Sequence, residues 1–188
     1  SGVAEGLSPT KEWKREVRGA DWVVGDSLHA AIGQGLVLAS PLQLAVMTSR
    51  IASGNAVLPR LVRSIDGVEQ PVLSTEALDI DPRNLAAVQQ GMYEVVNGAR
   101  GTGGGSRIVA DRVRMAGKTG TSQVRNITAA ERAAGVFRNE DLPWERRDHA
   151  LFVSYAPHDA PEVAVSVVVE HGGGGSTAAA PIARDIVL

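Results

Sequence analysis

The chain has 188 residues, of which 44% are hydrophobic, and carries 19 basic and 21 acidic residues for a formal net charge of −2. This length and hydrophobic content can supply one folded domain, and the balanced charge excludes a global field that would attract nucleic acid or an anionic membrane surface. Aromatic residues make up 4% of the chain and cysteine is absent, which disfavours base stacking and excludes disulfides and thiolate metal sites.

Residues 1–27 are polar and interrupted by Pro9, and they predict an entering loop with no domain start of its own. The first six residues lack the charged and apolar regions of a signal peptide, and no run of 18 apolar residues occurs. We therefore expect no segment of this chain to cross a membrane.

Residues 41–52 are apolar almost all round, which predicts a largely buried helix with Ser40 as its cap and Pro41 in its first turn. The dipeptide Asp66-Gly67 lies between residues 57–65 and 71–73 and predicts a small hairpin.

A second helix is predicted from Pro82, with Asp81 as its cap and its end at Asn97-Gly98. Residues 98–106 follow and hold five glycines, but Ser106 stands where G-x-G-x-x-G needs its last glycine. This segment predicts a flexible loop rather than a nucleotide-binding turn.

Between residues 109 and 115, odd positions carry Val109, Val113 and Met115 and even positions carry Arg112 and Arg114, which predicts a strand that runs directly into residues 116–123. Residues 124–148 are rich in charge and predict a long solvated loop, with one helical turn at residues 128–134. Two valine-rich strands at residues 150–155 and 163–170 and a terminal helix at 176–188 complete the pattern.

These elements predict an α+β fold in which helices pack on an antiparallel sheet. We expect three parts: the entering loop at 1–27, a helical part with the small hairpin at 28–107, and the three strands with the terminal helix at 108–188.

The segment 116–123, Ala-Gly-Lys-Thr-Gly-Thr-Ser-Gln, carries the main chemical signal. A phosphate-binding loop ending in Gly117-Lys118-Thr119 would need glycine at position 112, where the sequence has Arg112. The alternative is the K-T-G element of serine acyl-transferases that bind penicillin, for which glycines 117 and 120 would let a peptide backbone lie close to the strand. On its own, a chance tripeptide on an exposed strand explains it equally well.

Other blocks make the second interpretation specific. Residues 25–35 resemble the G-D-x-x-x-x-x-I-G-Q-G signature of class B penicillin-binding proteins, and residues 41–45 resemble its P-L-Q-L-A element. Residues 9–14 and 148–165 are similar to the elongation-class, penicillin-binding protein 2-like, subfamily. The resemblance covers essentially the whole chain and implies the C-terminal part of a transpeptidase domain with the serine β-lactamase-like fold.

The family's motifs run in the order S-x-x-K, S-x-N, K-T-G, with the first serine acylated. Residues 8–11 spell S-x-x-K, but Pro9 argues against a helix with serine and lysine on one face, and Ser53-Gly54-Asn55 falls at a helix end. We reject both, so no nucleophile is expected in this chain and the isolated chain is expected to be inactive.

The resemblance implies a role for each residue of the motif. Lys118 would be catalytic, supporting proton transfer, while Thr119, Gly120 and Thr121 would bind substrate. The Thr121 N–H would complete an oxyanion hole with the N–H of the absent serine. Strict strand alternation places Lys118 on the face opposite the two threonines, so their convergence needs local twist or a lysine that reaches round.

The implied function is peptidoglycan cross-linking by a D,D-transpeptidase in cell elongation and shape maintenance, at the periplasmic face of the bacterial inner membrane. Stem peptides, β-lactam antibiotics and a membrane glycosyltransferase are the implied partners, with no nucleic acid and no cofactor. A serine β-lactamase or β-lactam sensor is the alternative enzyme. A scaffold module that binds partners through residues 124–148 is the non-catalytic alternative.

The four histidines give no sign of other catalysis, because no pair has metal-ligand spacing and no G-x-S-x-G element occurs. We expect His29 to be structural and His149 to hold the long loop by hydrogen bonds. His158 and His171 are predicted to be solvated.

Overall fold

The computed structural model describes residues 4–71, 75–109, 113–125, 127–135 and 137–188. Their contacts group into two compact units, residues 1–44 and 45–188, with the division inside helix α3 (Pro41–Ser53). Within the described residues, no helix has the length and apolar content needed to span a bilayer.

The first unit contains two short helices, α1 (Lys11–Arg18) and α2 (Val24–Ala31), so the prediction of a loop over residues 1–27 is wrong. The Thr10 hydroxyl accepts a hydrogen bond from the Trp13 amide at 3.1 Å, and Gly19 ends α1 with a φ of 61°. These are ordinary start and stop signals. Neither helix has a buried residue, which is why no buried face appeared in the sequence.

An ion pair between Lys14 and Asp26 joins the two helices. The Lys14 Nζ atom lies 2.6 Å from the Asp26 Oδ2 atom, and their side chains are only 13% and 17% exposed. Asp26 also accepts a hydrogen bond from the Val23 amide at 2.7 Å at the start of α2. The hydrogen bond from Lys14, followed by that from Val23, lowers the pKa of the Asp26 carboxyl.

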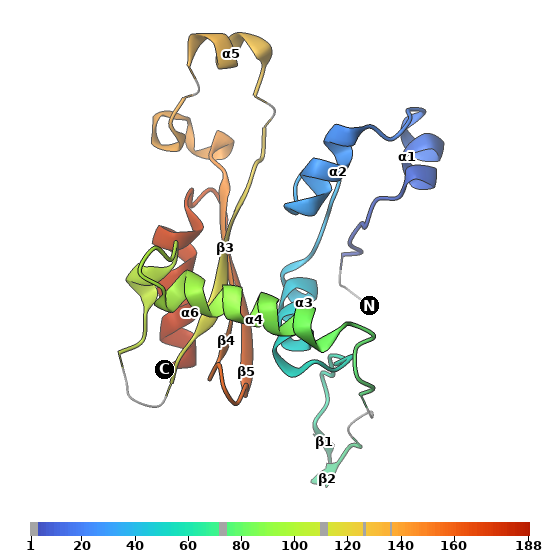
Figure 1. The fold of residues 1–188 in the computed structure, drawn as a ribbon, viewed down its shortest axis with the longest axis vertical. Coiled ribbons are helices and arrows are strands. Elements are labelled where there is room, and N and C mark those ends of the chain that lie inside the picture. The colour runs from blue at the N-terminus through green and yellow to red at the C-terminus, as the bar shows by residue number, and fades with distance from the viewer. Residues whose placement is uncertain (1–3, 72–74, 110–112, 126, 136) are drawn as a thin grey trace. The chain divides into compact units, whose positions relative to one another are not determined.

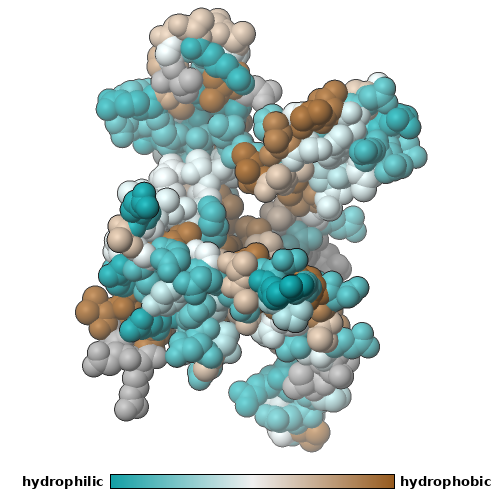
Figure 2. All heavy atoms as spheres, in the orientation of Figure 1, coloured by the Kyte–Doolittle hydropathy of each residue, from teal (hydrophilic) through white to brown (hydrophobic). Residues whose placement is uncertain are grey.

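One face of α2 is apolar and exposed. Val24, Leu28 and the following Ile32 are 78%, 65% and 72% exposed. Their spacing of four residues places them in one row along the helix, and Figure 2 shows apolar side chains along α2.

Helix α3 begins as predicted. The Ser40 hydroxyl accepts from the Gln43 amide at 3.2 Å, while the Gln43 side-chain oxygen accepts from the Ser40 amide at 2.8 Å. The expectation of a largely buried helix is wrong, because Thr48 is its one buried residue, and Leu42 and Met47 are 42% and 43% exposed.

The second unit is built on an antiparallel sheet in the order β3-β4-β5, formed by Ala116–Ser122, His149–Ala156 and Val163–Val169. Figure 1 shows these strands side by side, with α5 (Ala129–Ala134) beyond the end of β3. A separate hairpin pairs β1 (Ser64–Ile65) with β2 (Val68–Glu69). The predicted α+β fold is confirmed, as is a hairpin about Asp66-Gly67. Its second strand lies at Val68–Glu69 rather than at residues 71–73, and residues 72–74 lie outside the described part.

Two helices pack on this sheet: α4 (Pro82–Asn97) contacts β3, and α6 (Ala180–Val187) contacts β4 and β5. A π turn at Gly175–Ala179 leads into α6. Val96 from α4, Phe152 from β4 and Ala183 from α6 are fully buried in one hydrophobic core. Burial of apolar side chains between these elements is the main force that positions β3.

The limits of α4 agree with the prediction: Asp81 accepts a hydrogen bond from the Arg83 amide at 2.8 Å, and the helix ends at Asn97. The residues after it contain a 3₁₀ turn at Gly104–Ser106. The predicted strand over residues 109–115 is wrong where it can be compared, because pairing begins at Ala116 and Val109 is 88% exposed. Residues 110–112 lie outside the described part of the chain.

Candidate active site on strand β3

The segment Lys118-Thr119-Gly120-Thr121 lies on β3, an edge strand of the sheet within the described residues. Its one strand partner there is β4, with Lys118 opposite Val153, Thr119 opposite Phe152 and Thr121 opposite Ala150. The other edge of β3 therefore has no strand partner among the described residues. An extended peptide can add to such an edge by backbone hydrogen bonds.

The Lys118 side chain is exposed and folds against the backbone of its own strand. Its Nζ atom donates a hydrogen bond to the Thr119 carbonyl oxygen at 2.6 Å. Although alternation directs the Lys118 and Thr119 side chains to opposite faces, the long lysine chain brings its ammonium group to the backbone of the next residue. This contact is with the backbone of Thr119, so the convergence of the Lys118 ammonium with the threonine hydroxyls stays a prediction.

The Thr119 side chain is half-buried and has a partner that sequence reasoning missed. Its Oγ1 atom lies 3.1 Å from the Oγ1 atom of Thr102. Thr102 lies 17 residues earlier, in the glycine-rich loop after α4. A single threonine within a run of glycines was the available signal, but nothing in the spacing indicated where its side chain would lie.

The two glycines of the motif differ in their surroundings. A β-carbon added at Gly117 would lie 2.5 Å from the Phe152 ring and 2.7 Å from the Val153 carbonyl oxygen. The neighbour that requires glycine at position 117 is therefore β4 of the same chain, and not a bound peptide. Gly120 is half-buried, and Thr121 is exposed on the last part of the strand.

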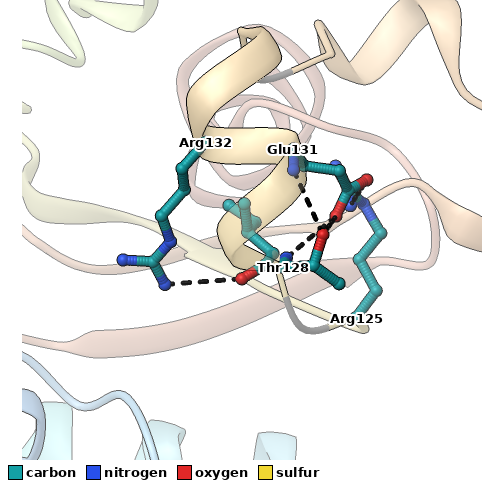
Figure 3. A network of polar contacts seen from close by, with 5 residues as sticks. Arg125, Thr128, Glu131 and Arg132 are labelled. Carbon is teal, nitrogen blue, oxygen red and sulfur yellow. Dashed lines mark hydrogen bonds and ion pairs between the residues drawn. The ribbon is translucent and has the colours of Figure 1, made fainter.

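The chain beyond β3 forms what we call the arm, residues 123–148. Figure 3 shows the polar network at its outer end, where Glu131 forms an ion pair with Arg125 at 2.7 Å. Glu131 also accepts from the Thr128 amide at 2.9 Å, and the Thr128 hydroxyl accepts from the Glu131 amide at 3.2 Å, a reciprocal cap that starts α5. The Thr128 amide and then the Arg125 charge lower the pKa of the Glu131 carboxyl. The predicted helical turn is confirmed.

A small cavity of about 130 Å³ lies in the arm just past the motif. It is lined by Gln123, Arg125, Ile127, Phe137, Asn139, Leu142 and Asp148. The Asn139 side-chain oxygen accepts from the Asp148 amide at 2.8 Å, which joins two of the residues that line the cavity.

Two histidines form a cluster at the base of the arm. His149 Nδ1 accepts from the His171 amide at 2.9 Å, and His171 Nδ1 lies 2.8 Å from the Arg147 carbonyl oxygen. The His171 ring also lies 4.3 Å from the Trp144 ring, centroid to centroid. His149 is thus hydrogen-bonded to His171, and it is His171 that contacts the loop, at Arg147 and Trp144. The role predicted for His149 stays a prediction, and the prediction of a solvated His171 is wrong.

His158 is not solvated either: its Nδ1 atom lies 3.0 Å from the Tyr155 hydroxyl, and its ring lies 4.7 Å from that of Tyr93. Desolvation by burial raises the pKa of Tyr155 to about 12. Among the residues that the structure describes, no group of three or more potential acidic or histidine ligands is placed to hold a metal ion.

The two rejected motifs do not form catalytic geometry. Ser8 precedes α1, which begins only at Lys11, so these two residues do not share a helical face. Ser53 ends α3, and its hydroxyl accepts from the Asn55 amide at 3.2 Å in a local turn.

An antiparallel sheet flanked by helices, with K-T-G on its edge strand, matches a known architecture. A family model described as the penicillin binding protein transpeptidase domain matches residues 2–188. The chain therefore belongs to the penicillin-binding transpeptidase family.

Relatives within that family include proteins named peptidoglycan D,D-transpeptidase MrdA. The peptidoglycan D,D-transpeptidase MrdA of Haemophilus influenzae is 40% identical over 95% of this chain and 28% of its own length, and that of Acinetobacter baumannii is 36% identical over 94% and 26%. The chain thus spans little more than a quarter of these relatives. The crystal structure of Pseudomonas aeruginosa PBP2 matches with a TM-score of 0.80 and 38% identity, over 99% of this chain and 38% of that one. Helicobacter pylori PBP2, in its complex with MreC, matches with a TM-score of 0.76 and 33% identity, over 96% and 30%.

Proposed function

We propose that this chain supplies one wall of the active site of a peptidoglycan D,D-transpeptidase that cross-links stem peptides during cell elongation. One observation carries the proposal: Lys118, Thr119 and Thr121 lie together on an edge strand that has no second strand partner in the described part of the chain. The relatives named as peptidoglycan D,D-transpeptidases support the choice of reaction.

An extended stem peptide would add to the free edge of β3, with its terminal carboxylate near the motif. The Lys118 ammonium would stabilise the developing negative charge and support proton transfer. The Thr119 and Thr121 hydroxyls would donate to the substrate carboxylate, and Gly120 would let the peptide backbone approach. Donors and a fixed cation are suited to this role because the carboxylate can only accept hydrogen bonds.

The reaction would proceed through an acyl-enzyme. A serine hydroxyl, supplied from outside residues 1–188, would attack the penultimate D-alanine carbonyl and release the terminal D-alanine. The amine of a second stem peptide would then displace the serine and form the cross-link. The Thr121 N–H would be one donor of the oxyanion hole, and such a donor contributes roughly 3 kcal/mol.

The same acyl-enzyme accounts for two further proposals. Water in place of the acceptor amine would give carboxypeptidase activity. A β-lactam would acylate the same serine and remain attached. We place the reaction at the periplasmic face of the bacterial inner membrane, with a membrane glycosyltransferase of the elongation machinery as the partner that supplies new glycan.

Labelling with a fluorescent penicillin tests the proposal. The full-length protein should form a stable covalent adduct on a serine outside residues 1–188, located by mass spectrometry. Residues 1–188 alone should gain no mass. Absence of labelling in the full-length protein, or an adduct on Ser8, would contradict the proposal.

The alternatives predict different results, a β-lactamase in the labelling assay and a scaffold module in a pull-down of its partners. A serine β-lactamase would hydrolyse the drug and return to its unmodified mass within minutes. A scaffold module would bind its partners equally well after Lys118→Ala but lose them when the arm is deleted.

A further inference from the structure

We infer that Thr102 is a positioning residue for the reaction, because its hydroxyl directs the Thr119 hydroxyl proton toward the substrate carboxylate. The inference rests on the proposed function and concerns a residue outside the K-T-G motif. It starts from the 3.1 Å separation of the two Oγ1 atoms, at which either hydroxyl can be the donor.

The chemistry of the substrate settles the direction of this hydrogen bond. A threonine hydroxyl has one proton to donate and two lone pairs that accept, whereas an ionised carboxylate only accepts. When Thr119 donates its single proton to the carboxylate, its oxygen can interact with Thr102 only by accepting. Thr102 must then be the donor, so the pair forms a chain that runs from Thr102 through Thr119 to the substrate.

The loop that carries Thr102 is fixed at both of its neighbouring residues. The Gly103 amide donates to the Val95 carbonyl oxygen in α4 at 2.8 Å, and the Gly101 amide donates to the Gly98 carbonyl oxygen at 3.1 Å. Thr102 therefore lies on an ordered turn. The prediction of a flexible loop does not describe this part of the segment.

The same end of α4 is tied to the strand that carries Thr119. The Asn97 side-chain amide donates to the Met115 carbonyl oxygen at 2.9 Å, one residue before β3 begins. The Arg107 side chain donates to the Asn97 carbonyl oxygen and closes the loop on the same residue. The end of α4 next to the Thr102 loop is thus tied to the start of β3 through the Asn97 side chain, which keeps the two threonines close to each other.

Two physical effects follow for Thr119. A hydroxyl that accepts a hydrogen bond becomes a better donor, because the bonds polarise one another. A hydroxyl whose orientation is already set also loses less rotational freedom when substrate binds. Since one hydrogen bond is worth about 0.5–1.5 kcal/mol net, we expect loss of the Thr102 hydroxyl to slow acylation roughly three- to tenfold.

The test compares Thr102→Val with Thr102→Ser in the full-length protein. Valine keeps the shape and removes the hydroxyl, whereas serine keeps the hydroxyl. We expect Thr102→Val to lower the second-order rate of acylation by a carboxylate-bearing β-lactam three- to tenfold and Thr102→Ser to retain it. Thr102 is exposed, and both variants should keep the unfolding temperature of the parent protein.

Two further measurements separate positioning from a structural role. In a Thr119→Val background, Thr102→Val should have no additional effect, because the hydroxyl that it orients is gone. With a β-lactam whose carboxylate is converted to an amide, the difference between Thr102→Val and the parent should shrink. Equal acylation rates for Thr102→Val and Thr102→Ser, or an undiminished loss of rate in the Thr119→Val background, would overturn the inference. The proposed function would still stand in that case, provided that the parent protein is labelled. If the parent protein does not label at all, both fail.

Discussion

Gly175 lies against Gly120, the last residue of K-T-G. A β-carbon at Gly175 would come to 2.6 Å from the Gly120 carbonyl oxygen and 2.2 Å from the Leu151 carbonyl oxygen. These are backbone atoms, which cannot move aside without shifting β3 or β4. The start of the π turn thus supports the motif through a contact that only glycine permits.

Gly175→Ala should therefore disturb the site as well as the fold. Forcing one methyl group into this contact costs typically about 1–3 kcal/mol, and the shift of β3 should lower the rate of penicillin acylation. Thermal unfolding and acylation of the full-length protein measure both effects. Gly105→Ala is the matched control, because nothing lies within 4 Å of a β-carbon at Gly105. Equal unfolding temperatures and acylation rates for the two variants would show that the contact at Gly175 does not support β3.

Lys118→Ala should lower acylation by a factor of about 10² or more, since a positioned group that takes part in proton transfer typically contributes 10²–10⁴. Stopped-flow acylation with a chromogenic β-lactam measures the rate. Lys11→Ala is the control, because Lys11 is exposed at the start of α1 and belongs to the rejected S-x-x-K. The assignment of Lys118 is wrong if Lys11→Ala causes the larger loss.

Asp26→Asn should loosen α1 and α2 at neutral pH, because it leaves the largely buried Lys14 ammonium without its counter-ion. Hydrogen exchange of residues 11–31 should accelerate. Asp21→Asn is the control: its pair with Arg15 is 80% and 71% exposed, and such surface pairs contribute little.

The effect of Asp26→Asn should depend on pH. The pKa of Asp26 is lowered from its ordinary value of 3.8, so its stabilising contribution is present above that value and is lost as pH falls through the lowered pKa. The difference in exchange between the parent and Asp26→Asn should therefore be full near neutrality and shrink in strong acid. A difference that grows on acidification would contradict this role.

Substitutions of Glu131 should separate charge from capping in the arm. Glu131→Gln keeps a side-chain oxygen for the Thr128 amide but removes the charge opposite Arg125, while Glu131→Ala removes both. Exchange of residues 127–134 should increase from parent to glutamine to alanine. Glu140→Gln, whose partner Arg138 is 73% exposed, should change nothing in this segment. The same rates in the alanine variant and the parent would show that the network does not hold α5.

The sequence was most informative where the local chemistry alone decides the structure. Helix α4 begins at Pro82 and ends at Asn97 as predicted, because a capping aspartate, a first-turn proline and a terminal glycine act on their own neighbours. The same holds for α5, whose cap is complete within residues 128–131. The K-T-G segment could be placed on a strand, although its roles stay predictions.

Long-range packing was harder to predict. The pattern over residues 109–115 resembled a strand, but pairing begins only at Ala116, opposite Tyr155. Where β3 begins depends on where its partner β4 ends, and residues 109–115 carry no information about β4. The contact of Thr102 with Thr119 and that of His171 with Trp144 likewise depend on how distant segments meet. Helices α1 and α2 were missed because they are held by an ion pair and caps, without a buried apolar face.

The base of the arm has a consequence for how this protein can vary. Ser122 and His149 are paired across β3 and β4, so the chain leaves the sheet and returns to it at one point. Residues added or removed in the outer part of the arm, away from the contacts of Trp144 and Arg147 with His171, change mainly the closure of a loop, at a free-energy cost that rises slowly with length. This outer part can thus be exchanged as a module, while the register that aligns Lys118 with Val153 stays the same.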